Sequence, residues 1–228
     1  VTSVLNDYPL IDNIVFFDDS LTLSRDYLKD LLEVFRKAPR PFKWGCWSRA
    51  NAIDPETARA MAQAGCSTIS FGLESGSDRL LAAMGKGVTA AQGLAAVEAC
   101  RAAGIRPRAT FIIGLPGETF SEAMETLSFV ERSGLRHDAS VAIQDGLKYY
   151  PGSEWCSDFM KDHPGFDWDN PPPGLPGNYD PDGRLLVPVC RFPAEQNLML
   201  RERLHRILTA RRPLWRRGIG YALRLLRR

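Results

Sequence analysis

The chain has 228 residues, 44% of them hydrophobic, so it can bury a sizeable core, and its length favours one domain or a domain with an appendage. No apolar run approaches the roughly 20 residues of a membrane span, and the N-terminus lacks a signal-peptide layout, so the sequence predicts a cytoplasmic protein. The net charge of +2 is uneven, because residues 201–228 hold ten arginines and one glutamate and the rest is net negative.

Five short runs rich in β-branched and aromatic residues predict buried strands. They are residues 14–17, 42–47, 68–71, 109–113 and 139–143. Helices are predicted between them from N-cap signals and capping boxes, with a shorter helical insertion after the third strand. The signals are Ser24, Asp54-Pro55, Thr89 with Gln92, and Thr119 with Glu122.

Strands and helices thus alternate, with strands about 30 to 40 residues apart, which is the spacing of right-handed parallel crossovers. The prediction is an α/β fold with parallel strands. Because five units fall short of the eight in a closed barrel, we expect an open, partial (β/α) barrel. Its limits are predicted at residues 1–155.

Two further segments are predicted after the barrel. Residues 156–193 are rich in Pro, Gly and Asp and are expected to form a loop. Residues 194–228 are expected to form a basic helical tail. This tail could bind an anionic membrane or nucleic acid, or it could dock on the barrel with a solvated end, which the sequence favours.

The five cysteines are too scattered for a zinc or C-x-x-C motif and are expected to be core thiols. They stand at positions 46, 66, 100, 156 and 190.

Polar or glycine-rich residues follow every predicted strand, at the edge where parallel α/β folds bind ligands. Each has a simpler explanation: an aspartate can serve a turn, an arginine can pair with a carboxylate, and a glycine can make a tight turn. The candidates are Asp18 and Asp19 after the first strand, Arg49 after the second, Glu74 and Ser75 after the third, Gly114 after the fourth, and Gln144 and Asp145 in the fifth unit.

Glu74 ends the third predicted strand in the stretch Gly-Leu-Glu-Ser-Gly. A carboxylate at this edge can accept two hydrogen bonds from a vicinal diol, as in ribose recognition, or balance a bound cation. Gly72 and Gly76 would let a ligand approach the backbone closely. A solvated loop glutamate is the alternative.

Four segments, FFDDSLTL, AGCSTISFGLESGSDRLLAAMGKG, ATFIIGLPGET and YYPGSEW, resemble successive strand-end motifs of radical S-adenosylmethionine (SAM) enzymes. The resemblance covers roughly residues 10–155 and is nearest to the branch that often carries an upstream cobalamin-binding domain. It implies a partial (β/α)6 barrel in which SAM, held against a 4Fe–4S cluster, is cleaved reductively to act on an unreactive carbon by methylation, cyclisation or rearrangement.

Carried over by motif, the resemblance implies that Glu74 and Ser75 contact the ribose or amino-acid end of SAM. Arg49 would lie in the SAM pocket, and Ile113 with Gly114 would pack near the adenine. Asp18 and Asp19 would face the same cavity. The implied cofactors are SAM and a 4Fe–4S cluster, with cobalamin as a further candidate.

One departure from the resemblance concerns the cluster. The C-x3-C-x2-C motif of the family is absent from these residues, so its ligands are expected upstream and the chain alone is expected to be inactive. The implied partners are a small-molecule or lipid-like substrate, an electron donor such as a flavodoxin or ferredoxin, and a peripheral membrane contact through the tail.

Two other functions stay open on the residues alone. One is a lyase or hydrolase barrel that binds a divalent metal through Asp18, Asp19 and Glu74. The other is a non-catalytic α/β module that binds membrane or RNA through the arginine-rich tail.

Overall fold

The structure is a computed structural model of the whole chain. It describes residues 1–18, 21–135, 141–145, 147–148, 152–162, 164–165, 178–179, 185–187 and 192–209.

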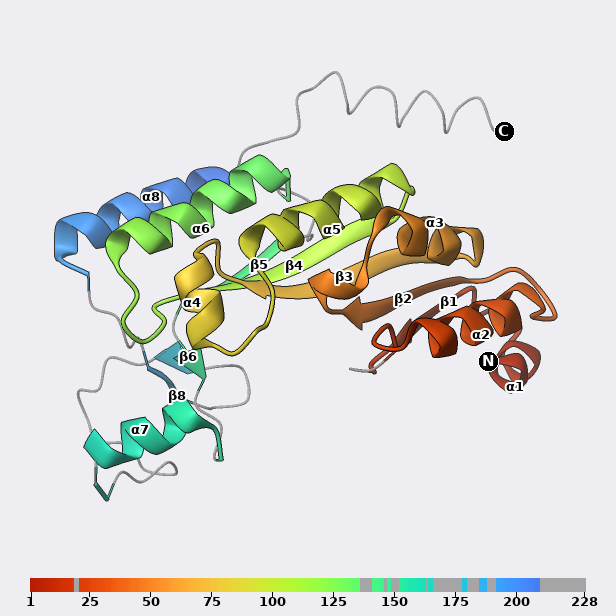
Figure 1. Cartoon of the computed structure of the whole chain (residues 1–228), viewed down its shortest axis with the longest axis horizontal. Coiled ribbons are helices and arrows are strands. Elements are labelled where there is room, and N and C mark those ends of the chain that lie inside the picture. The colour runs from red at the N-terminus through yellow and green to blue at the C-terminus, as the bar shows by residue number, and fades with distance from the viewer. Residues whose placement is uncertain are drawn as a thin grey trace.

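The centre of the fold is a five-stranded sheet of order β1-β2-β3-β4-β5 in which every neighbouring pair is parallel (Figure 1). The strands are β1 (Asn13–Phe16), β2 (Lys43–Ser48), β3 (Cys66–Glu74), β4 (Arg106–Ile113) and β5 (Val141–Asp145). Each overlaps a strand that the apolar runs predict. The α/β fold with an open parallel sheet is therefore confirmed.

Helices connect the strands in the order that the sequence predicts. The predicted ones are α2 (Arg25–Arg36), α3 (Pro55–Gln63), α4 (Asp78–Ala83), α5 (Ala90–Ala102), α6 (Phe120–Ser133) and, after the sheet, α8 (Ala194–Thr209). The helices α1 (Thr2–Asp7) and α7 (Glu154–Asp162) and the short 3₁₀ helix η1 (Ala50–Ala52) were not predicted. The side chains of Ser24 and Asp54 cap α2 and α3, and both expected capping boxes form, at Thr89 and Thr119.

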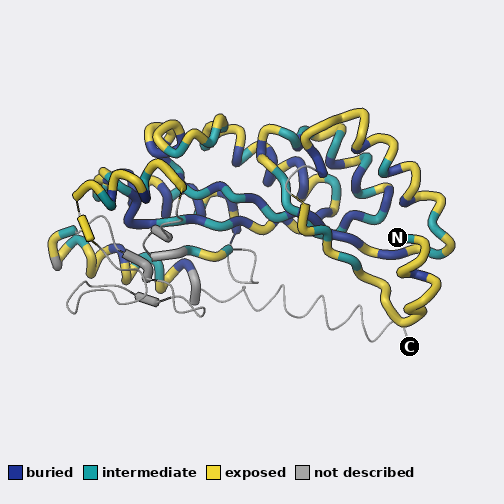
Figure 2. The backbone as a smooth tube through the Cα atoms, turned by 90° about the horizontal axis from the view of Figure 1, so that it is seen from below, coloured by how far each residue is buried: buried dark blue, intermediate teal, exposed yellow. Residues whose placement is uncertain are grey.

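The main core lies between the sheet and its helices. Along β3 and β4 buried side chains alternate with half-buried or exposed ones, so every second residue faces the helices. Phe111 of β4, for example, meets Phe129 of α6 with ring centroids 5.7 Å apart. Figure 2 shows the buried residues running along the central strands, with exposed residues on the outer turns of the helices.

The opposite face of the sheet, called here the inner face, carries the intervening side chains. On β3 and β4 these include Ser70, Glu74, Arg108 and Thr110. Since the helices that cover the core pack on the other side, the inner face is where a ligand could meet the strands.

The C-terminal helix α8 packs along α6, as Figure 1 shows. Leu200 and Ile207 of α8 are buried. Arg203 binds the carboxylate of Glu131, with 2.5 Å from Nη2 to Oε2, and also donates to Ser128 Oγ at 3.0 Å. The described part of the expected basic tail is thus a docked helix, and residues 210–228 lie outside the described residues.

Residues 156–193, expected to form a loop, contain regular structure. Most of α7 falls there, together with β7 (Asn178–Tyr179) and β8 (Leu185–Val187), which join β6 (Leu147–Lys148) in a small sheet of order β6-β8-β7. Its two strand pairs are antiparallel.

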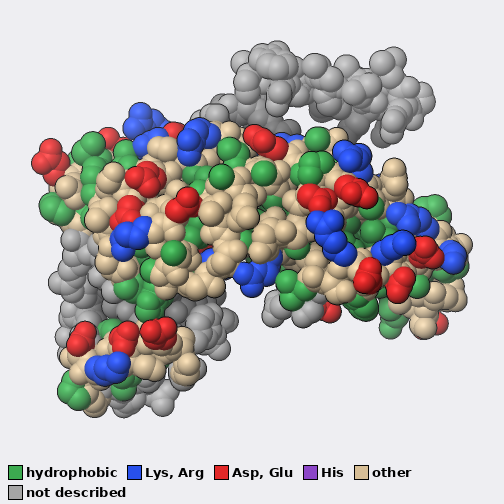
Figure 3. All heavy atoms as spheres, in the orientation of Figure 1, with side chains coloured by type: hydrophobic (Ala, Val, Ile, Leu, Met, Phe, Trp, Pro, Cys, Tyr) green, Lys and Arg blue, Asp and Glu red, His purple; other side chains and the backbone are tan. Residues whose placement is uncertain are grey.

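In the part of the chain that the structure describes, no helix is both long and apolar enough to cross a membrane. On the face drawn in Figure 3, acidic and basic side chains are interspersed, and neither sign forms a continuous patch.

Candidate functional site

A cavity of about 820 Å³ lies at the carboxyl half of the sheet, between the inner face, the end of α4 and the start of α7. A pocket of this size suits a nucleoside-sized or larger ligand. The sheet contributes Glu74, Thr110–Ile112, Ala142 and Ile143, and the two helical walls contribute Ala82–Gly85 and Ser153–Trp155.

The backbone at Glu74 has an unusual conformation. Its φ of 61° is the one positive value at a non-glycine residue in the described chain, and the N–H of Ser75 donates to the carbonyl of Leu73 at 2.7 Å. The register between β3 and β4 also shifts here. A side chain in this region is strained, and such strain concentrates at ligand sites.

The carboxylate of Glu74 meets the ammonium of Lys86, with 3.0 Å between Nζ and Oε1. Both side chains are largely buried, at 31% exposed for Lys86 and 15% for Glu74. Arg49 donates from its guanidinium to the backbone carbonyl of Lys86, so it holds the loop that carries the lysine. Glu74, Lys86 and Arg49 therefore form one connected group beside the cavity.

Gly72 keeps the backbone open next to this group. A Cβ atom at Gly72 would lie 2.5 Å from Oε1 of Glu74 and 3.3 Å from Nζ of Lys86. Any other residue would push the ion pair aside. The glycine thus leaves the space that the ion pair of Glu74 and Lys86 occupies.

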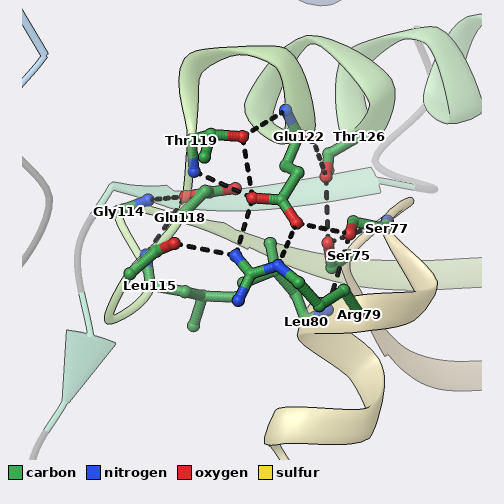
Figure 4. A network of polar contacts seen from close by, with 11 residues as sticks. Ser75, Ser77, Arg79, Leu80, Gly114, Leu115, Glu118, Thr119, Glu122 and Thr126 are labelled. Atoms are coloured by element: carbon green, nitrogen blue, oxygen red, sulfur yellow. Dashed lines mark hydrogen bonds and ion pairs between the residues drawn. The ribbon is translucent and has the colours of Figure 1, made fainter.

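A polar network ties α4 to the β4–α6 loop and to α6 (Figure 4). Arg79 forms a two-pronged ion pair with Glu122, with Nε–Oε1 and Nη2–Oε2 both 2.7 Å, and Nη2 also donates to the carbonyl of Gly117 at 2.7 Å. Glu122 accepts from Ser77 Oγ at 2.9 Å and from the N–H of Thr119 at 2.9 Å. This network fixes α4, one wall of the cavity.

The two carboxylates of this region have opposite pKa shifts. Hydrogen bonds from Arg79, followed by those from Thr119 and Ser77, hold the pKa of Glu122 well below its usual range. Burial raises the pKa of Glu118, although its Oε2 accepts from the N–H groups of Gly114 at 2.5 Å and Leu115 at 3.1 Å. Glu118 thereby shapes the turn after β4, where Gly114 has φ 95°.

The structure brings together only some of the predicted site residues. Glu74 lines the cavity, and Arg49 is linked to it through Lys86. The hydroxyl of Ser75 is buried against Thr126, with 3.2 Å between the oxygens. Ile113 points into the main core, and its neighbour Ile112 lines the cavity instead.

The two aspartates after β1 were predicted to face the same cavity. Asp18 is exposed, and Asp19 lies outside the described residues, as do the side chains of Gln144 and Asp145. Among described residues no three or more His, Cys, Asp or Glu side chains are arranged to hold a metal ion. The lysine partner of Glu74 also disfavours a cation there. The described residues therefore give the divalent-metal alternative no support.

Lys86 is the residue at this site that the sequence analysis missed. It stands between two glycines, Gly85 and Gly87, which have φ values of 64° and 62°. A lysine in a tight glycine turn directly after a helix is the signal that could have identified it.

The described residues fit SAM but not an iron–sulfur cluster. The Glu74 carboxylate lines the cavity and can accept hydrogen bonds from a ribose diol. The described cysteines are all buried, and burial raises the pKa of Cys46 and of Cys100 to about 12 and that of Cys66 further. Such thiols do not serve as thiolate ligands to iron.

Comparisons with known proteins agree with the fold and the motifs. An uncharacterized methyltransferase of Pyrococcus horikoshii is 35% identical over 122 residues, which are 54% of this chain and 27% of that protein. A tRNA-2-methylthio-N(6)-dimethylallyladenosine synthase of Pelobacter propionicus is 46% identical over 70 residues, or 29% of this chain and 16% of that protein. The chain thus spans about a quarter or less of these relatives.

Among solved structures, the radical SAM methyltransferase TsrM from Kitasatospora setae, with cobalamin and a [4Fe-4S] cluster bound, has a TM-score of 0.62. It is 22% identical, and the match covers 86% of this chain and 38% of that chain, which shows a shared fold. Residues 3–130, more than half of the chain, match the Radical SAM superfamily. The chain belongs to the radical SAM superfamily of enzymes.

Proposed function

We propose that this chain forms the nucleoside-binding part of a radical SAM enzyme and that Glu74 binds the ribose hydroxyls of SAM. The observation that carries the proposal is the position of the Glu74 carboxylate, held by Lys86 at the edge of an 820 Å³ cavity. A carboxylate oriented by an ammonium can accept two hydrogen bonds from a vicinal diol.

The other residues of the site would orient the cofactor and exclude water. Ile112 gives the cavity an apolar floor for a base, and Met84 and Trp155 pack beside it. Arg49 would act through the Lys86 loop. Because the described cysteines do not fit a cluster, the thiolates for one would have to come from other residues.

We further propose that the complete protein transfers a methyl group to an unreactive carbon, with cobalamin as a candidate second cofactor. Two likenesses support this proposal: the chain resembles a methyltransferase in sequence, and it resembles a cobalamin-bound methyltransferase in fold. A small-molecule substrate, a flavodoxin or ferredoxin donor, a cytoplasmic location and a membrane contact of the tail stay predictions.

The edge of the sheet supports a larger barrel in the complete protein. In the described residues β1 pairs with β2 alone. Val15, on the inner face of β1, is 52% exposed, and Phe17, the residue directly after the strand, is 83% exposed. An apolar edge strand of this kind is normally covered or paired. We therefore propose that a further strand pairs with β1 and that residues 1–155 supply strands two to six of the barrel.

Binding of 5′-methylthioadenosine tests the role of Glu74. This probe keeps the ribose and adenine of SAM but lacks the amino-acid part, so its binding does not depend on a cluster. Isothermal titration of the 228-residue chain should show that Glu74→Gln weakens binding about tenfold or more, the scale of a lost hydrogen bond to a charged group. Glu98→Gln, the same change at an exposed position of α5, should have no effect. Equal affinities of the wild type and Glu74→Gln would refute the proposal.

A further inference from the structure

A second cavity, of about 540 Å³, lies at the amino ends of β1 and β2, away from the cavity that Glu74 lines. Its walls are the end of α2, residues 38–43 leading into β2, and the end of α3 with the turn into β3. Figure 1 shows these elements at the right of the molecule, whereas α6, α7 and α8 lie at the left. A cavity of this size can hold a small molecule.

The walls of this second cavity carry more positive than negative charge. Arg36, Arg40 and Lys43 line it, and Asp12 is the one acid that the described residues add to the lining. In the part of the chain that the structure describes, none of these four side chains forms an ion pair. The described lining thus has an excess of two positive charges that no paired carboxylate neutralises.

Arg40 is held in place by one nitrogen of its guanidinium group. Nη2 donates to the backbone carbonyls of Ile11 at 2.6 Å and Tyr8 at 3.1 Å, which follow α1. Pro39 and Pro41 stand on either side in the sequence, and each fixes its own φ; Pro41 also restricts the backbone of Arg40. Nε and Nη1 of Arg40 make no hydrogen bond to the described residues. The arginine is therefore positioned before any ligand binds, and two of its nitrogens stay available.

Arg36 and Lys43 also keep donors that no contact uses. Arg36, in the last turn of α2, donates through Nη2 to the carbonyl of Ala60 at 3.3 Å, and a cation there suits the helix dipole. The carbonyl of Ala64, at the end of α3, is already bonded to Nε1 of Trp44 at 2.8 Å. Lys43, the first residue of β2, is exposed, and its ammonium has no partner among the described residues. Capping of helix ends thus accounts for one nitrogen of each arginine and for no part of Lys43.

We propose that this second cavity binds the phosphate group of a small metabolite. Two guanidinium groups present N–H donors in the forked geometry that phosphate oxygens accept, and the Lys43 ammonium adds a point charge. A phosphate monoester carries a charge of about −1.5 to −2 at pH 7, which balances the excess charge of the described lining. Pro39 and Pro41 give the rest of the molecule an apolar surface. Because this cavity and the Glu74 cavity have no residue in common, the site does not depend on the proposed function.

Lysine acetylation by sulfosuccinimidyl acetate, measured residue by residue by mass spectrometry, tests this site in the full chain. Inorganic pyrophosphate serves as the probe. With pyrophosphate well above its dissociation constant, acetylation of Lys43 should slow about fivefold or more. Lys37 is exposed, lies outside the described lining and pairs with Glu33 at 3.8 Å, so its rate should stay within about twofold in the same sample. Sodium chloride at the same ionic strength should not reproduce the difference. A residue-level readout also separates the site from pyrophosphate bound to the arginine-rich tail.

Two variants make the test specific to the cavity, because each removes one positive charge from neighbouring positions. In Arg36→Gln pyrophosphate should no longer protect Lys43, whereas in Lys37→Gln the protection should persist. Circular dichroism checks that both variants fold, and if Arg36→Gln does not, the wild-type comparison of Lys43 with Lys37 still decides. Three results would overturn the proposal: equal slowing at Lys37 and Lys43, continued protection of Lys43 in a folded Arg36→Gln protein, or no slowing at Lys43 with about 10 mM pyrophosphate. The proposed function fails separately, through unchanged nucleoside binding in Glu74→Gln.

Discussion

Replacing Glu122 by glutamine should destabilise the fold through the network that holds α4. The residue Glu122 is 8% exposed. Its carboxylate accepts five hydrogen bonds: one from Ser77, two from Arg79 and two from Thr119. Glutamine has the same size as glutamate, but an NH2 group replaces one carboxylate oxygen. This NH2 donor would then face N–H and O–H groups that are themselves donors to the carboxylate. The two hydroxyls can rotate to accept from it, whereas the N–H groups of Arg79 and Thr119 cannot.

The expected loss follows from the donors that stay unsatisfied. A hydrogen bond to a charged group contributes about 1.5 to 3 kcal/mol, and water compensates part of the loss at Arg79, whose side chain is 57% exposed. We therefore expect Glu122→Gln to lower the free energy of unfolding by about 2 to 3 kcal/mol at pH 7. Urea unfolding followed by circular dichroism measures this difference. Glu125→Gln, the same change at an exposed position of α6, is the matched control and should stay within about 0.5 kcal/mol of wild type.

The pH dependence of this loss has a definite sign. The folded-state pKa of Glu122 is lowered, so its ionised form stabilises the fold at every pH above the unfolded pKa of about 4.3, and this stabilisation fades as the pH falls below that value. The gap between wild type and Glu122→Gln should thus be constant from pH 7 to about 5 and narrow below about 4. A Glu122→Gln protein as stable as Glu125→Gln at pH 7, or a gap that is unchanged at pH 3, would refute this reasoning.

Two further predictions concern buried thiols and backbone strain. Burial raises the thiol pKa of Cys46, Cys66 and Cys100. Iodoacetamide at pH 8 should therefore leave all three cysteines unmodified in the native chain and label them in urea, which mass spectrometry can measure. Fast labelling of the native chain would contradict their burial. Glu74→Gly removes a side chain from a residue at φ 61° and with it the ion pair to Lys86. The relieved strain should offset the added chain entropy and the lost ion pair, so the free energy of unfolding should change by less than about 1 kcal/mol, while nucleoside binding is lost. A large loss of stability in urea unfolding would show that Glu74 is chiefly structural.

The sequence predicted those parts of the fold that depend on local signals. A capping box needs only residues three apart, so Thr119 and Glu122 could be identified without any knowledge of the tertiary structure. The strands follow from apolar runs, and their predicted ends differ from the structure by three residues or fewer. The sequence reasoning did not predict helix α7 (Glu154–Asp162), which overlaps the start of the predicted loop segment and ends before its prolines and glycines.

Contacts between segments that are distant in the sequence could not be predicted from local patterns. The capping residue Glu122 also binds Arg79, 43 residues earlier, and no local pattern announces that pairing. The sequence does not show which of Ile112 and Ile113 points into the main core, because an apolar run gives no sign of where the alternation of faces begins. Packing of the strand against its helices determines that Ile113 faces the core and Ile112 the cavity. The ion pair of Lys86 with Glu74 arises because α4 turns the chain back to the end of β3.

Glu74 shows how these two levels combine at the site. Its place after a strand was visible in the sequence, but its positive φ and its lysine partner come from the way α4 returns to the sheet. Glycine would be the less strained residue at such a φ, as at Gly114 after β4. A glutamate there makes sense if the carboxylate itself is used: it pairs with Lys86 in the structure, and in the proposed function it also binds the ribose of SAM. The network around Arg79 and Glu122, which holds α4 in place, would then be what keeps the Lys86 loop against that carboxylate.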